Sequence, residues 1–438
     1  MGDRLTLRVP EPVVRIARTL ERSGFETWCV GGAVRDALLG HAHLDWDLAT
    51  AATPQQVRAL FRRTIPVGIE FGTVGVLDRE GTMHEVTTFR HDVQTDGRHA
   101  VVEFGASLDD DLARRDFTIN AIAYSPTTHE LRDPFGGRAD LQRGVVRAVG
   151  AADERMREDR LRALRAIRFA ARFGFRIEDD TWRAITASAP FLGRLSPERV
   201  KQELEKTMQQ VERPSIALSL WQESGAFAAV VPSLATVSAL TCSAVDAIPR
   251  PVRAKQAHRA IDRFTVLFSE LTPRDAARAL RALRFSNHDI AWIESVLERW
   301  RLVNEAMTTA LVASVPPSDA AVRRWVGTMG RTRTAAVLRV AAARWCAMRM
   351  AGIAAPSAAR VASLYRRALR SAFHDPIELS DLAVDGNDLR EAGIPAGPSL
   401  GRVLERLLDL VIENPALNTR DQLLTSARAV YDQLTQEP

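Results

Sequence analysis

Two aspartates separated by one residue follow shortly after a pair of glycines in the N-terminal part of the chain. The glycines are Gly31 and Gly32, and the aspartates are Asp45 and Asp47. Side chains two apart on a strand share a face, so both carboxylates are expected to point the same way. Glycines let backbone N–H groups approach a bound anion, and the helix expected after them points its positive end toward it. Two carboxylates beside such a turn suit magnesium-dependent phosphoryl or nucleotidyl transfer.

A third carboxylate, Glu85, lies in the β-branched segment 83–89, which is expected to form a strand. Thr87 and Phe89 are expected on the same face of that strand. Glu85 could act as a further metal ligand or as a general base toward an attacking hydroxyl. The alternative is a solvent-exposed strand charge with no chemical role.

A basic cluster follows at Arg114 and Arg115. A guanidinium can bind two phosphate oxygens at once, so adjacent arginines suit a triphosphate. Asp116 and Asn120 are candidates for binding ribose hydroxyls. The alternative is the start of a helix, with Asp116 as its N-cap and the arginines on the surface.

An arginine-rich helix is expected over 153–176, with apolar residues on one side and arginines, among them Arg162 and Arg165, on another. Asp159 and Arg162 would be neighbours on one face of it. Cytosine and adenine each present an amino donor beside a ring-nitrogen acceptor, whereas uracil and guanine present a carbonyl beside an N–H. A carboxylate next to a guanidinium therefore selects C and A over U and G. The alternative is that Asp159 and Arg162 simply pair with each other.

The composition is that of a globular protein with more than one domain. The 438 residues are 46% hydrophobic and 26% charged, and the formal net charge of +5 suits a polyanionic partner. The three cysteines are widely spaced, which favours buried thiols over a disulfide framework or a cysteine-based zinc site. The N-terminus lacks the apolar segment of a signal peptide, and no apolar run is long enough to span a membrane. We therefore expect a cytoplasmic protein.

Strand-like and helix-like segments are mixed up to about residue 150, after which Leu, Ala and Arg recur at helical spacing. The strand-like segments 72–78 and 83–89 are expected to form a hairpin. We therefore expect an α/β head of about 150 residues followed by an all-helical remainder.

With these residues the chain resembles the bacterial class II CCA-adding tRNA nucleotidyltransferases, a family that shares its head with bacterial poly(A) polymerases. The motifs that carry the resemblance lie at 31–36, 45–47, 85–90, 114–121, 133–141, 158–162 and 196–199. The resemblance implies an α+β fold that begins with a small polymerase-beta-like nucleotidyltransferase head containing a mixed sheet. It also implies three parts, namely a catalytic head (1–150), a helical neck that selects the base (151–215), and a helical body and tail that bind tRNA (216–438).

The activity that the resemblance implies is template-independent addition of C, C and A to the 3′ end of tRNA, from CTP and ATP, with release of pyrophosphate. It implies that Asp45 and Asp47 hold two Mg²⁺ ions and that Glu85 assists them. The nucleotide-binding residues that it implies are Gly31, Gly32, Arg35 and Arg115 for the triphosphate, Asp116 and Asn120 for the ribose, and Asp159 and Arg162 for the base, with Arg165 as a further nucleotide-binding residue. The oligomeric state stays open.

Three features indicate which member of the family the chain is. Residues 96–99 resemble the flexible loop used in the switch from C to A. The segments 381–386, 397–401 and 418–424 resemble the tail that grips tRNA in CCA-adding members, and the segment near 258–287 lacks the ligands of a His-Asp phosphohydrolase. Poly(A) polymerase, or an enzyme that adds only CC or only A, is the alternative within the same chemistry.

Two other classes share part of the pattern. A small-molecule nucleotidyltransferase has similar Gly-rich and Asp-x-Asp elements, but a small acceptor needs no long arginine-bearing helical platform. A catalytically inactive RNA-binding protein would not need the three carboxylates Asp45, Asp47 and Glu85, all of which are present.

Overall fold

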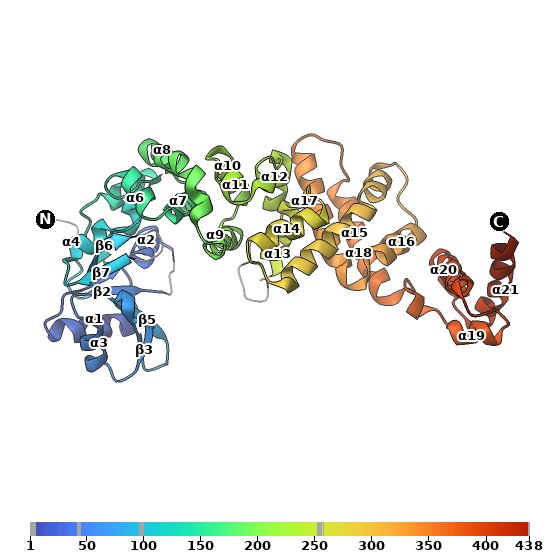
Figure 1. Cartoon of the computed structure of the whole chain (residues 1–438), viewed down its shortest axis with the longest axis horizontal. Coiled ribbons are helices and arrows are strands. Elements are labelled where there is room, and N and C mark those ends of the chain that lie inside the picture. Colours follow the sequence, from blue (N-terminus) through green and yellow to red (C-terminus); the bar gives the residue numbers. More distant parts are fainter. Residues whose placement is uncertain (1–5, 42–44, 96–99, 252–255, 257, 437–438) are drawn as a thin grey trace. The chain divides into compact units, whose positions relative to one another are not determined.

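The computed structural model describes residues 6–41, 45–95, 100–251, 256 and 258–436, and the predicted loop at 96–99 lies outside them. The chain folds into two compact units, which Figure 1 displays in sequence colours. They comprise Met1–Thr207 with Ile216–Ala235, and Met208–Ser215 with Thr236–Pro438. The predicted head and most of the predicted neck belong to the first unit, and the three-part division stays a prediction.

The head is built on a mixed sheet with the strand order β3 (Thr64–Gly68), β4 (Thr73–Leu77), β5 (Met83–Thr88), β2 (Asp47–Thr50), β1 (Thr27–Val30), β8 (Ala123–Tyr124) and β9 (Leu131–Arg132). β2 and β5 run parallel, and the other neighbours are antiparallel. β4 and β5 form the hairpin that the sequence predicts, with Leu77 opposite Met83. A separate ribbon consists of β6 (Arg90–Thr95) and β7 (Ala100–Phe104).

Helices complete the head because residues along each central strand alternate between two apolar cores. On one face, Val30 and Ala49 pack with Leu108 and Leu112 of α4 (Leu108–Ala113). The helices α1 (Glu11–Arg22) and α3 (Pro54–Leu60) also pack on the strands and lie near β3 and β5 in Figure 1. The other helical segments of the head are α2 (Gly32–Leu38), η1 (Ile69–Phe71), η2 (Thr118–Asn120) and α5 (Gly137–Arg143).

The predicted neck (151–215) contains α6 (Ala152–Glu158), α7 (Leu161–Phe173), α8 (Asp179–Ser188), η3 (Ala189–Arg194), α9 (Pro197–Gln210) and the start of α10 (Pro214–Glu223), and α11 (Ala226–Val230) and η4 (Pro232–Leu234) follow it. The single helix predicted over 153–176 is wrong, because Asp159 has an extended backbone that separates α6 from α7. Its carboxylate accepts a hydrogen bond from the N–H of Leu161 at 3.0 Å and so favours a new helix start. After α7, β11 (Arg176–Ile177) pairs in parallel with β10 (Val145–Val146), which ties the neck to the end of the head.

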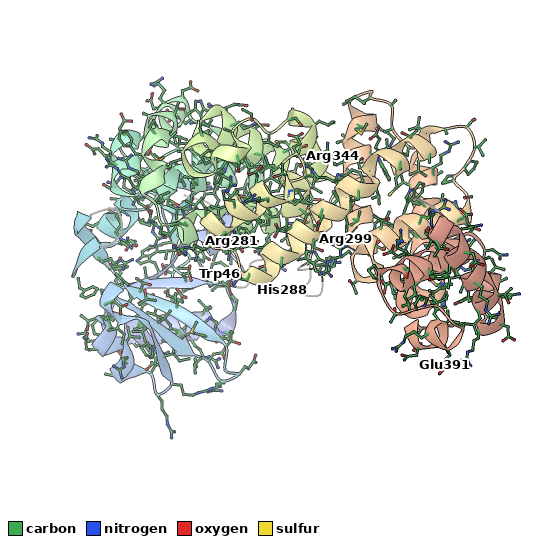
Figure 2. All side chains as sticks on the ribbon, turned by 45° about the vertical axis from the view of Figure 1, so that its right-hand side comes forward. Trp46, Arg281, His288, Arg299, Arg344 and Glu391 are labelled. Carbon is green, nitrogen blue, oxygen red and sulfur yellow. The ribbon has the colours of Figure 1, made fainter. Side chains whose placement is uncertain are left out.

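The second unit is all-helical in the part of the chain that the structure describes, as predicted. Its first helices are α12 (Ala239–Asp246), α13 (His258–Leu267), α14 (Pro273–Ala282), α15 (Asn287–Val312), α16 (Asp319–Met329), α17 (Arg331–Met350) and α18 (Ala358–His374). Arg344 of α17, labelled in Figure 2, donates to the hydroxyls of Thr241 and Ser269 at 2.9 and 2.8 Å. None of the described helices combines the length and the apolar character needed to cross a membrane.

The C-terminal helices of this unit pack around a core of their own. They are α19 (Gly386–Glu391), α20 (Pro398–Glu413) and α21 (Arg420–Gln436), with the short turns η6 (Leu379–Asp381) and η7 (Pro415–Leu417). Leu389, Val403, Leu407 and Leu423 are almost fully buried in this core. The segments that resemble a tRNA-gripping tail therefore form one small helical bundle.

Candidate active site

The two aspartates of the Asp-Trp-Asp segment lie on one face, as predicted. Asp45 and Asp47 are exposed and Trp46, labelled in Figure 2, is buried with 3% of its surface exposed. β2 begins only at Asp47, so Asp45 directly precedes the strand instead of lying within it. The parallel register pairs Leu48 with Val86, which sets Asp47 level with Glu85 on the neighbouring strand. The sheet thus brings the three predicted carboxylates to one edge of β2 and β5.

Asp47 lies within electrostatic reach of the other two carboxylates. Desolvation, followed by the negative charges of Glu85 and Asp45, raises the pKa of Asp47 to about 6, while the positive charge of Arg115 acts to lower it. Carboxylates crowded in this way favour a bound cation. Among the described residues, no three His, Cys, Asp or Glu side chains form a ready-made metal cage. A magnesium ion, which usually keeps water and substrate phosphate among its ligands, fits such an open pair of carboxylates.

The glycine turn lies beside this cluster. Gly31 precedes α2 with φ +74°, a conformation that L side chains rarely adopt. A Cβ atom built there would lie 2.9 Å from Nη1 of Arg115. Gly31 is therefore required both for the backbone turn and for the close approach of Arg115.

Arg115 is positioned by a buried carboxylate that sequence reasoning missed. Its Nη2 donates to Oδ2 of Asp111 at 3.0 Å, and Nε of Arg114 donates to Oδ1 of the same residue at 3.2 Å. Asp111 is 1% exposed. The signal was present in the sequence, since an acidic residue three and four positions before two arginines can pair with both on a helical turn.

Arg35, Asn120, Asp116 and Arg165 form a continuous chain of hydrogen bonds. Nη1 of Arg35 donates to Oδ1 of Asn120 at 2.6 Å, and Nδ2 of Asn120 donates to Oδ1 of Asp116 at 2.9 Å. Nε of Arg165 donates to Oδ2 of Asp116 at 2.8 Å. Burial alone would raise the pKa of Asp116, but the charge of Arg165 and these hydrogen bonds hold it below its usual value. The chain connects the turn at α2 with helix α7.

Arg35 has little access to solvent in this arrangement. The residue is 3% exposed, and its guanidinium also pairs with Asp36 at 2.7 Å. The rings of Phe169 and Phe173 flank it at 5.1 and 4.8 Å. These contacts favour a role in orienting Asn120 over the predicted direct contact with a triphosphate.

Asp159 and Arg162 lie near the start of α7, and each side chain pairs with a different residue. Oδ2 of Asp159 accepts from Nη2 of Arg199 at 2.8 Å, so the neck motif at 196–199 does contact it. Nη1 of Arg162 donates to Oε2 of Glu158 at 2.7 Å. The alternative in which Asp159 and Arg162 pair through their side chains is therefore wrong. Arg199 and Glu158 hold the two side chains apart, and both stay partly accessible.

The chain matches known proteins over nearly its full length. A family model described as the poly A polymerase head domain matches residues 27–147, and one described as the "Probable RNA and SrmB- binding site of polymerase A" matches residues 174–237. The CCA-adding enzyme of Geobacillus kaustophilus is 37% identical over 419 residues, which cover 94% of this chain and 95% of that protein. The chain belongs to the CCA-adding enzyme family. The family resemblance identified from the motifs is thereby confirmed.

Other members of the CCA-adding enzyme family agree with this assignment. The enzyme of Lactiplantibacillus plantarum is 33% identical over 420 residues, covering 95% of each protein. The crystal structure of the Bacillus stearothermophilus CCA-adding enzyme in complex with CTP matches with a TM-score of 0.74 at 30% identity, and both chains are covered completely. The Thermotoga maritima CCA-adding enzyme complexed with tRNA shares the fold, with a TM-score of 0.64 at 21% identity over 96% of each chain. The predicted class, an α+β fold with a nucleotidyltransferase head, is confirmed.

Membership of the CCA-adding enzyme family implies an enzyme that uses a divalent metal ion. The crowded carboxylates of Asp45, Asp47 and Glu85 fit that requirement, since the pKa of Asp47 responds to the other two.

Proposed function

We propose that this chain adds C, C and A to the 3′ end of tRNA from CTP and ATP without a template and releases pyrophosphate. The observation that carries the proposal is the register of β2 and β5, which sets Asp47 level with Glu85 beside the Gly31–Arg115 contact. Nucleotidyl transfer needs carboxylates for metal ions next to groups that bind a triphosphate. The choice of tRNA as acceptor and of CTP and ATP as nucleotides follows from the similarity to CCA-adding enzymes. The reaction would take place in the cytoplasm, where these substrates occur.

Asp45 and Asp47 would hold two Mg²⁺ ions. Such ions, when bound, neutralise charge on the reacting phosphate and favour the ionised form of the attacking 3′-hydroxyl. In the transfer, the 3′-oxygen of the RNA forms a bond to the α-phosphorus as the bond to the bridging oxygen of pyrophosphate breaks. Glu85, exposed beside Asp47, is proposed to accept the hydroxyl proton or to complete the metal site.

The triphosphate would contact the backbone N–H groups of Gly31 and Gly32 and the guanidinium of Arg115. Arg115 keeps about a fifth of its side chain exposed and acts electrostatically on Asp47, which supports a position beside both phosphate and carboxylates. Asp116 and Asn120 are proposed to face the ribose. Their hydrogen bonds to Arg35 and Arg165 would fix the orientation of both groups, so these two arginines are positioning residues.

Asp159 and Arg162 are proposed to read the Watson–Crick edge of the incoming base. An acceptor beside a donor matches the amino group and ring nitrogen of cytosine and adenine. Arg199 and Glu158 support this role because they restrain the two side chains without connecting them to each other. Selection of C and A by protein groups removes the need for a template.

Incubation of the purified protein with tRNA lacking its 3′ CCA tests the proposal. CTP and ATP are supplied singly and together, and the products are sized. Stepwise addition of C, C and A that then stops supports CCA addition. A ladder of A residues would identify a poly(A) polymerase, and products that stop after CC, or that need a preformed CC end, would identify the specialised enzymes. Replacement of Mg²⁺ by EDTA in parallel reactions tests the metal.

A further inference from the structure

An exposed aromatic ring on the neck is flanked by two arginines. The guanidinium carbons of Arg160 and Arg194 lie 4.5 and 5.2 Å from the centre of the Phe191 ring. Phe191 is 43% exposed. Phe191 and Arg194 belong to η3, whereas Arg160 directly precedes α7. These three side chains are called the Phe191 platform below.

The platform carries positive charge that no carboxylate neutralises among the described residues. Arg160 donates only to the hydroxyl of Ser188, at 3.1 Å. Desolvation and the nearby charge of Arg194 lower the pKa of the Arg160 guanidinium. By contrast, Arg162 and Arg199 on the same part of the neck have carboxylate partners. Two close, uncompensated guanidinium groups favour an anionic ligand.

The ligand class follows from the combination of groups. Guanidinium groups bind phosphates, and both their planes and exposed aromatic rings stack on nucleobases. A stacking surface combined with positive charge is typical of binding to single-stranded nucleic acid. Arg160 is adjacent to Asp159, and the matched RNA-binding segment 174–237 contains the other two residues.

We propose that the Phe191 platform binds the single-stranded 3′-terminal nucleotides of the tRNA, stacking a base on Phe191 and its flanking guanidinium planes and pairing backbone phosphates with Arg160 and Arg194. The inference rests on the proposed function, because tRNA is the acceptor there. It adds a surface beside the base-selecting residue that holds the RNA and not the incoming nucleotide.

A binding assay tests this proposal without catalysis. The anisotropy of tRNA labelled at its 5′ end gives the Kd of the full chain for tRNA that lacks only its terminal A and so keeps a single-stranded 3′ end. Phe191→Ala and Phe191→Leu should each weaken binding about tenfold. Phe191→Trp keeps an aromatic ring and should bind as tightly as the unaltered protein. Arg194→Ala should weaken binding. It should also reduce the slope of log Kd against log salt concentration by about one. With tRNA whose single-stranded 3′ end is removed, the variants should bind as the unaltered protein does.

Arg183→Ala is the matched control. Arg183 lies on α8 of the same neck and is 73% exposed, but it pairs with Asp180. This variant should leave the Kd for tRNA unchanged. The melting temperature of each variant and the KM for CTP are measured in parallel, and both should stay at the value of the unaltered protein.

Several outcomes would contradict the proposal that the Phe191 platform binds RNA. They are an unchanged Kd in the Phe191 and Arg194 variants, an equal loss in Arg183→Ala, and a defect confined to the KM for CTP. Failure of the proposed function is a separate result, in which the unaltered protein adds no nucleotide to tRNA whatever the Kd values are.

Discussion

Nη1 of Arg35 donates to Oδ1 of Asn120 at 2.6 Å, although the two residues are 85 positions apart in the chain. Arg35 belongs to α2, directly after the glycine turn, and Asn120 ends η2. Phe169 and Phe173 of α7 flank the same guanidinium. The proposed ribose-binding group therefore depends for its position on both the phosphate-binding turn and the neck.

Arg35→Met should impair stability and nucleotide binding together. The substitution leaves a buried amide oxygen without its donor and removes one of two arginine partners from the buried carboxylate of Asp36, so the free energy of unfolding should fall by about 3–5 kcal/mol. The KM values for CTP and ATP should rise by the same factor, because Asn120 would face the ribose that both share. Urea unfolding and initial rates measure the two effects. The control is Arg18→Met on the exposed face of α1, and loss of stability with unchanged KM values would exclude the positioning role.

Asp47→Asn should separate catalysis from stability. Removal of a carboxylate proposed to hold the metal should reduce the rate of nucleotide addition at least about a hundredfold. The folded protein raises the pKa of Asp47 to about 6, so its ionised form is disfavoured there and is a cost to stability at pH 8. In EDTA at pH 8 the variant should therefore melt no lower than the unaltered protein. A large drop in melting temperature would show that Asp47 is needed for folding.

The local parts of the site could be predicted from the sequence. The alternation expected from Asp45 to Asp47 agrees with the exposure of both aspartates and the burial of Trp46, although only Asp47 belongs to β2. Parallel pairing of β2 and β5, which no local pattern encodes, then brought Glu85 level with Asp47. Glu85 itself was recognisable because its neighbours are typical of a strand.

Long-range partners and one helix boundary could not be predicted. Apolar periodicity continues across Asp159, so the sequence favours one helix there, but the side chain of Asp159 bonds to the N–H of Leu161 and the helix is interrupted. The pairing of Asp159 with Arg199 spans 40 positions and depends on how α9 packs near α7. Helical spacing alone therefore suggested Arg162 as the partner.

Arg162→Ala and Arg199→Ala should both reduce base selectivity, by different routes. Loss of Arg162 removes a donor to the base, and loss of Arg199 frees the carboxylate of Asp159 to move. A charged hydrogen bond contributes about 1.5–3 kcal/mol, so incorporation of U and G relative to C should rise at least about tenfold in Arg162→Ala. Arg199→Lys should retain more selectivity than Arg199→Ala because it keeps a donor. Single-nucleotide incorporation with each triphosphate measures the ratios, and equal loss of rate for all four would contradict base reading.

Gly31→Ala and Gly24→Ala form a matched pair that isolates the contact with Arg115. Both glycines have positive φ, +74° and +86°, so an alanine at either position should lower stability, by about 1–3 kcal/mol at Gly31, where ψ is −134°. Only at Gly31 would the new methyl group meet a guanidinium, at 2.9 Å, whereas no atom lies within 4 Å of a Cβ at Gly24. Displacement of Arg115 should raise the KM for CTP and ATP in Gly31→Ala, while Gly24→Ala should keep normal values. If both variants kept normal KM values, Arg115 would not require its present position to bind the triphosphate.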